Sequence, residues 1–157
     1  MNNLKRIAYL FAYIFLCSFY SSAQSDTIPK ANKLILEFAT NSINKKVGNG
    51  ECWTLAANAL NTSNAKWDGI FEFGKKVNYP TEKALPGDII QFKNIKIKDE
   101  NETMVMAQHT GIITKINNDG SVEIANQNVN GKKKVVISHI KLNKVVKGKF
   151  FIYRPQI

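Results

Sequence analysis

The sequence predicts one α+β domain in which N-terminal helices pack on an antiparallel β-sheet. Apolar residues recur at helical spacing in residues 29–46 and again in about 51–60. From residue 89 onward the chain changes to short runs that are rich in β-branched and aromatic residues. Helices that are followed by a series of strands are typical of the α+β class.

The two helices are expected from their ends as well as from their apolar spacing. Thr27 can cap the first helix, and Pro29 suits its first turn because a proline there loses no hydrogen bond. The glycine-rich run 48–50 separates the helices. The second helix starts at about Glu51, and its apolar stripe consists of Cys52, Leu55, Ala56, Ala59 and Leu60.

Five strands are expected after an irregular region at residues 65–87. The turn signals Asn118-Asp119-Gly120 and Asn130-Gly131 separate successive strands of this series. The expected strands are residues 89–92, about 105–116, 121–128, 135–140 and 150–153.

Residues 1–23 are expected to be a signal peptide. Lys5 and Arg6 form a basic start, residues 7–20 are an almost unbroken apolar run, and Ala23 ends a small-residue cleavage site. Two alternatives are less favoured. The run is short for a membrane anchor, and bulky residues before Cys17 do not fit lipoprotein processing. We therefore expect a secreted or periplasmic protein, with no stable membrane insertion after cleavage.

The composition is that of a globular domain with a basic surface. Apolar residues make up 44% and charged residues 22%, which excludes a wholly disordered chain. Removing residues 1–23 leaves 134 of the 157 residues and lowers the formal charge by two, from +10 to +8. The charge is almost all lysine, with Arg154 the one arginine left, so a nucleic-acid partner is not expected. Contact with an anionic cell envelope is favoured instead.

Cys52 is the candidate nucleophile. It is the single cysteine of residues 24–157, so no internal disulfide is expected. It falls in the first turn of the second helix, where unpaired N–H groups and the helix dipole favour a nucleophilic thiolate. Its backbone N–H is available to an oxyanion, and Gly50 would let a substrate backbone come close. The alternative is an inert, buried cysteine.

His109 is the candidate base. A thiol nucleophile needs a base within hydrogen-bond reach, and the chain has two histidines. His109 precedes Gly111, which leaves open space on the same face of the strand. His139 instead alternates with isoleucines in a later strand.

The hairpin after His109 predicts which residues orient its ring. If Ile116 pairs with Ser121, then His109 faces Asn128, and Asn126 lies on the same face of the sheet. Either asparagine is thus placed to fill the third role of a catalytic triad. The alternative is that both asparagines only finish the strand.

Four segments in order carry a family resemblance: Gly50-Glu51-Cys52-Trp53, then residues 85–92, 109–113 and 119–128. Together they resemble the CHAP (cysteine, histidine-dependent amidohydrolase/peptidase) branch of the NlpC/P60 superfamily, over roughly residues 45–154. The resemblance implies a papain-like fold with Cys52 as nucleophile and His109 as base. Many members have Glu and Asn where this chain has Asn126 and Asn128, so the charge that would stabilise imidazolium is missing.

The resemblance implies an exported cysteine hydrolase that cleaves amide or peptide bonds. Its substrate would be peptidoglycan, cut as an endopeptidase or an N-acetylmuramoyl-L-alanine amidase, or another peptide. Trp53 and Gly50 would bind substrate. The alternative is a weak or inactive module of the same fold that binds the cell wall or a protein partner. No cofactor or metal is expected, because one cysteine and two distant histidines lack zinc-site spacing. The oligomeric state is left open.

Overall fold

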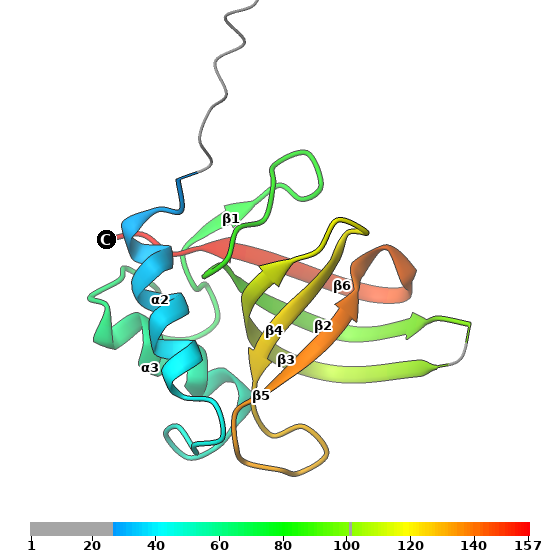
Figure 1. Ribbon diagram of the computed structural model, residues 1–157, viewed down its shortest axis with the longest axis horizontal. Coiled ribbons are helices and arrows are strands. Elements are labelled where there is room, and N and C mark those ends of the chain that lie inside the picture. Colours follow the sequence, from blue (N-terminus) through cyan, green and yellow to red (C-terminus); the bar gives the residue numbers. More distant parts are fainter. Residues whose placement is uncertain (1–26, 101) are drawn as a thin grey trace, which may run out of the picture.

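The computed structural model describes residues 27–100 and 102–157. The predicted signal peptide, with Cys17 and its cleavage site, lies outside these residues. The described part contains two α-helices, one 3-10 helix and six strands (Figure 1). They are α2 (Lys30–Asn41), α3 (Cys52–Thr62), β1 (Lys75–Val77), β2 (Ile89–Lys98), β3 (Thr103–Ile116), β4 (Ser121–Asn126), β5 (Val136–Lys141), η2 (Leu142–Lys144) and β6 (Val145–Arg154).

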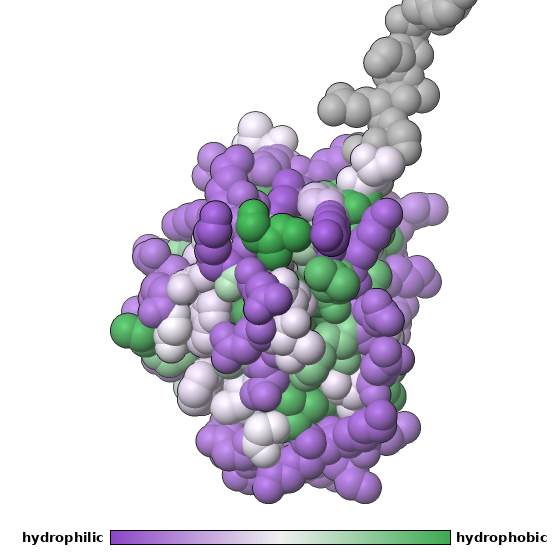
Figure 2. All heavy atoms as spheres, turned by 90° about the vertical axis from the view of Figure 1, so that its left-hand side faces the viewer, coloured by the Kyte–Doolittle hydropathy of each residue, from purple (hydrophilic) through white to green (hydrophobic). Residues whose placement is uncertain are grey.

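The strands form one antiparallel sheet in the order β1-β6-β2-β3-β4-β5. Helices α2 and α3 lie side by side against one side of this sheet (Figure 1). The predicted α+β class is therefore confirmed. No helix of the described residues is long and apolar enough to cross a membrane. The helix-bearing side of the molecule is mainly hydrophilic, with separate hydrophobic areas (Figure 2).

Both faces of the sheet are buried, because alternate residues of the central strands point to opposite sides. Ile89 and Ile112 pack with the helices in one core cluster. Ile90 and Ile113 pack in a second cluster on the other face. Full burial of each such side chain stabilises the fold by about 1.5–3 kcal/mol.

Several element boundaries differ from the sequence expectation. Helix α2 ends at Asn41, and its N-cap is Pro29 rather than Thr27. The chain leaves the helix because Asn44 N donates to Val135 O and Val135 N donates to Lys45 O, at 2.9 Å each. These bonds join the segment after α2 to the residue before β5.

The strands also differ. Strands β2 and β6 are longer than expected because their lysine-rich halves pair with each other, with register shifts on either side of Lys96. Strand β1 was not expected, since three residues are too short to show a period. It lies within the region 65–87 that the sequence analysis treats as irregular, and it pairs with the end of β6.

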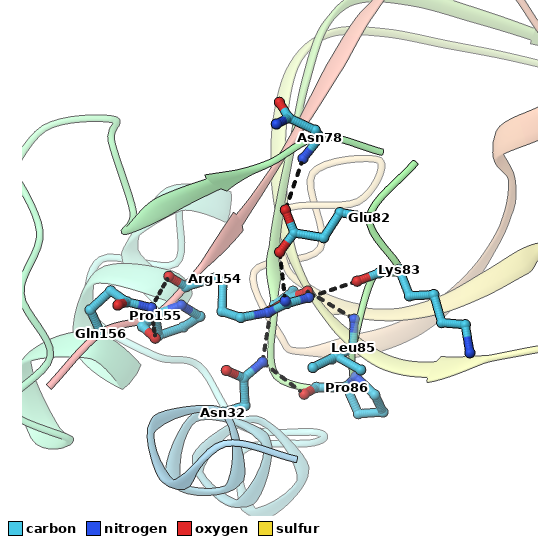
Figure 3. A network of polar contacts seen from close by, with 10 residues as sticks. Asn32, Asn78, Glu82, Lys83, Leu85, Pro86, Arg154, Pro155 and Gln156 are labelled. Atoms are coloured by element: carbon cyan, nitrogen blue, oxygen red, sulfur yellow. Dashed lines mark hydrogen bonds and ion pairs between the residues drawn. The ribbon is translucent and has the colours of Figure 1, made fainter. Parts of the chain in front are cut away.

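A buried charged cluster joins α2, the turn before β2 and the end of β6 (Figure 3). The Asp88 carboxylate is fully buried. It accepts hydrogen bonds from Leu85 N at 2.8 Å, Arg154 Nη2 at 2.9 Å and Asn32 Nδ2 at 2.7 Å. The partners of Asp88 on α2 and β6 could not be read from the sequence. Glu82 Oε1 accepts a further bond from Arg154 Nη1 at 2.9 Å.

Candidate active site

His109 and Asn126 are in direct contact. His109 lies on β3, Asn126 ends β4, and His109 Nε2 is 2.7 Å from Asn126 Oδ1. The strands pair here as predicted, with Ile112 opposite Ala125. Near the turn, however, Ile116 pairs with Val122 rather than with Ser121, because the register shifts between Ile113 and Lys115. Beyond the shift the register at Ile113 and Ile112 is as predicted, but the pairing of β3 with β4 stops there, so the predicted pairing of His109 with Asn128 does not form.

The Asn126 amide is held in one orientation. Its Nδ2 donates to Val136 O at 3.1 Å, Ser138 Oγ at 3.0 Å and Ile124 O at 3.2 Å. Carbonyl oxygens only accept hydrogen bonds, so the nitrogen must point toward them and the oxygen toward His109. His109 Nε2 therefore carries the hydrogen that it donates to Asn126. In the neutral imidazole, Nδ1 then has the free lone pair.

Burial lowers the pKa of His109 below its ordinary value, and the hydrogen bond with Asn126 opposes this shift only in part. A protonated imidazolium would have to be desolvated, and no carboxylate among the described residues bonds to the ring to compensate. His109 is therefore mainly neutral at pH 7, which is the form that can accept a proton.

The two residues after Asn126 bind the N-terminus of α3. Gln127 Nε2 donates to Glu51 O at 2.8 Å, and Asn128 Nδ2 donates to Glu51 Oε2 at 2.8 Å. Asn128 thus bonds to Glu51 and not to the imidazole. Residues 126–128 connect His109 to the residue that precedes Cys52, so the two candidate catalytic residues lie at one junction of α3 with β3 and β4.

Glu51, Gln127 and Lys133 at this junction were not singled out by the sequence analysis. Lys133 Nζ lies 2.7 Å from Glu51 Oε1, and this contact lowers the pKa of Glu51. Gln127 is fully buried and also bonds to Val47 and Thr54. The bonds of Gln127 and Lys133 have no sequence signal, since 73 to 82 positions separate the partners.

Cys52 is the first residue of α3 and is half-buried. No hydrogen bond joins it to His109 within residues 27–100 and 102–157. Trp53 beside it is 37% exposed and could touch a substrate. Gly50 has a φ of +87°, and a Cβ there would lie 2.7 Å from Lys133 Cβ. The Lys133 stem therefore covers the side of Gly50 that was expected to face a substrate.

A groove of about 430 Å³ opens at the histidine. His109, Asn126 and Asn128 line one end of it, while Cys52 is not among its lining residues. His139 lies outside this groove, on β5 opposite Glu123. Among the described residues, no group of three or more His, Cys, Asp or Glu side chains could hold a metal ion.

Helices packed on an antiparallel sheet, with a cysteine at a helix start and a histidine on a strand, define a cysteine proteinase fold. The chain belongs to the AIM3/BBC1 cysteine proteinase-fold domain family, whose model matches residues 29–156. The match supports the predicted papain-like fold as a cysteine proteinase fold. It does not single out the CHAP or NlpC/P60 branch.

One curated relative is altered inheritance of mitochondria protein 3 of the yeast Debaryomyces hansenii. The two sequences are 27% identical over an alignment of 169 residues. The alignment covers 87% of this chain and 18% of that protein. The chain therefore spans less than a fifth of the relative's length.

Two solved structures share the fold. The crystal structure of Ly7917 has a TM-score of 0.50 and 16% identity, and covers 79% of this chain and 62% of that chain. Ly7917 with the hydrolyzing product of MDP has a TM-score of 0.50 and 17% identity, over 79% and 63% of the two chains. At such low identity these likenesses show the fold alone.

The expected localisation, secreted or periplasmic, is wrong. The curated relative is a yeast protein named for the inheritance of mitochondria, which lie inside the cell. The expectation depended on the composition of residues 1–23 alone. A basic start and an apolar run are short, local signals that the folded domain does not test.

Proposed function

We propose that this chain is a cysteine hydrolase that cleaves amide bonds in peptides. Cys52 is the nucleophile, His109 is the base, and Asn126 holds the imidazole in the reactive tautomer. The observation that carries the proposal is the 2.7 Å contact between His109 Nε2 and Asn126 Oδ1. Because this contact uses Nε2–H, it leaves Nδ1 free to take the thiol proton.

The reaction is acyl transfer to water. Cys52 Sγ attacks the amide carbonyl carbon while its proton passes to His109 Nδ1, and N–H groups at the start of α3 stabilise the oxyanion. The C–N bond then breaks, and the imidazolium gives its proton to the leaving amine. Water attacks the resulting thioester with His109 again as base, which releases the carboxylic acid and restores the thiol.

The proposal includes a relationship to the CHAP branch and peptidoglycan as one substrate. Within the cysteine proteinase fold, the ordered motifs from Gly50 to Asn128 favour a CHAP-like relationship. Peptidoglycan stem peptides are one substrate of the proposed class, and no contact among the described residues selects them over other peptides. Substrate identity is therefore left to the assay.

The test is hydrolysis of a peptide library and of purified peptidoglycan, followed by mass spectrometry. The wild-type protein should cleave either members of the peptide library or peptidoglycan. The cleavage rate of Cys52→Ser should be lower by roughly 10³-fold or more. His109→Ala should show a comparable loss. His139→Ala is the matched control, since His139 lies outside the groove, and it should retain activity. Unchanged cleavage in Cys52→Ala would contradict the proposal.

A second candidate is a binding module of the same fold without catalysis. It is favoured by the absence of a hydrogen bond between Cys52 and His109 in the described chain and by the lack of a charge at Asn126. A wild-type protein that cleaves nothing, and whose Cys52 reacts with iodoacetamide no faster than free cysteine, would support this candidate.

A further inference from the structure

We propose that the uncovered edge of β3, at residues 103–110, binds the peptide substrate as an added β-strand that leads to His109. The inference rests on the proposed hydrolase function for its final step, the delivery of an amide bond to Cys52. Strand addition itself depends only on the sheet edge.

Strand β3 has a neighbouring strand along most of one edge, but along the other edge it has one only near its C-terminal end. It pairs with β2 from Thr103 to Ile112, but with β4 only from Ile112 to Ile116. Among the strand pairs of the described chain, none involves the second side of residues 103–110. This edge is eight residues long, which is about 27 Å of extended strand.

The free backbone groups of this edge point into the groove beside His109. Ile113 N donates to Asp88 O at 2.8 Å, so the backbone groups of Ile113 face the β2 side. Alternate residues of an antiparallel strand present these groups to opposite sides. The alternation restarts at Asn94 and Ala107, which do not pair, and Asn94 has a φ of +49°. Met104 and Met106 therefore lie on the same face as His109 and present their backbone groups to β2. Gln108 and Val105 present theirs to the open side, and both line the groove with His109.

The edge lacks the charges that normally protect an exposed strand. Proteins discourage strand addition with lysines and other charged residues on their edges. The outer strand β1 has Lys75 and Lys76, and β5 has Lys141. In contrast, residues 103–114 contain no Lys, Arg, Asp or Glu in a chain with 22 Lys and Arg. An edge without such protection suits a partner strand.

The lining of the groove indicates the chemistry of that strand. Met104 and Met106 are flexible apolar side chains that adapt to different apolar partners. Glu102 is the one carboxylate of the lining, and no Lys or Arg of the described residues lines the groove. The substrate is therefore an extended peptide with apolar side chains and a basic residue near Glu102. Glu102 precedes His109 by seven positions, so the basic residue lies about 24 Å, or seven residues, from the scissile bond.

Binding should be measured on Cys52→Ala, which cannot hydrolyse the probe. The probes are fluorescent ten-residue peptides of Val, Thr and Leu with Lys at one end, read by anisotropy. Methylation of a single backbone nitrogen in the pairing register should weaken binding roughly tenfold, because it removes one hydrogen bond to the edge. Methylation in the other register should change it little. Equal effects of both registers, or no binding at millimolar protein, would overturn the proposal.

Two protein variants test the same edge by changing β3 instead of the peptide. Val105→Pro removes an N–H that points to the open edge while the β2 partners of Met104 and Met106 remain, so it should weaken binding roughly tenfold. Val105→Ile is its control and should bind as the parent does. If Val105→Pro fails to fold, the methylated peptides still decide the question. A change in sedimentation without a change in peptide affinity would assign the edge to a second copy of the chain and overturn the proposal.

Charge reversal tests the predicted basic residue. Glu102→Lys should reverse the preference for a Lys probe over a Glu probe, by roughly three- to fivefold, since the pair is exposed. Glu100→Lys makes the same change outside the groove lining and should leave the preference unaltered. Equal responses of the two variants would overturn the assignment of Glu102.

Hydrolysis and binding separate the two proposals. Register-dependent binding without cleavage by wild type would contradict the hydrolase and leave strand addition intact. Cleavage that neither methylation register nor Val105→Pro affects would leave the hydrolase intact and overturn strand addition.

Discussion

Two polar clusters join the helices to the sheet, and they use opposite chemistry. The cluster around Asp88 pairs formal charges, with Arg154 Nη2 and the Asp88 carboxylate 2.9 Å apart and Asp88 fully buried. Around His109, neutral amides hold the ring and the start of α3: Asn126 contacts the imidazole, and Gln127 Nε2 donates to Glu51 O. A buried ion pair fixes geometry but tolerates no loss of a partner. Neutral amides orient a histidine while allowing its charge to change, which a base requires.

Removal of Asp88 should give the largest effect on stability. Asp88→Ala leaves the largely buried Arg154 guanidinium without its buried partner and should lower the free energy of unfolding by about 3–5 kcal/mol. Urea denaturation measures this loss. Glu82→Gln removes only the more exposed partner of Arg154 and should cost about 1 kcal/mol or less. Equal losses in both variants would contradict a special role for the buried pair.

Gln127→Ala should give the next largest effect. It removes buried hydrogen bonds to Val47, Glu51 and Thr54 and should lower the free energy of unfolding by about 2–3 kcal/mol. The start of α3 would loosen, so iodoacetamide should label Cys52 at an altered rate. Gln156→Ala is the matched control, because within the described part of the chain the exposed Gln156 side chain donates to the nearby carbonyls of Arg154 and Pro155. A stable variant with unchanged labelling would show that Gln127 does not hold the helix start.

A negative charge placed beside His109 should raise the pKa of its imidazole. Asn126→Asp places a carboxylate against the imidazole, which favours the protonated ring, so the pKa of His109 should rise. The acidic limb of kcat/KM should then move to higher pH. NMR titration of the ring protons gives the shift directly. Asn130→Asp adds the same charge to the groove without contacting His109, and a shift as large in that variant would contradict the contact-based explanation.

The smallest expected effect is the pH dependence of stability. The pKa of His109 is lowered in the folded protein relative to about 6.5 in the unfolded chain. The unfolded state therefore binds more protons below that value. The contribution of His109 to stability is complete above about pH 6.5 and is lost as the pH falls toward its folded pKa.

Urea denaturation from pH 5 to pH 8 measures this dependence. His109→Gln should reduce the loss of stability at low pH, whereas His139→Gln should retain it. Identical pH profiles for wild type and His109→Gln would show that the histidine does not titrate differently in the two states.

The sequence by itself determined the α+β class and the face that His109 shares with Asn126. Both follow from local rules, since helical spacing, turn residues and the alternation of a strand act over a few positions. The predicted register also holds at Ile112 and Ile113, beyond an unpredicted shift near the turn. Their catalytic roles remain predictions for the assays above.

Tertiary structure alone decided which asparagine meets the imidazole. Strand β4 ends at Asn126, and Asn128 lies outside it with a φ of +62°, which turns its side chain to Glu51. It also decided where α2 ends, and the pairing of Asp88 with Arg154, 66 positions apart. Each of these depends on contacts between distant segments, which form only when the sheet and helices have assembled. The open edge of β3 has the same origin, because it exists only where the shorter β4 stops.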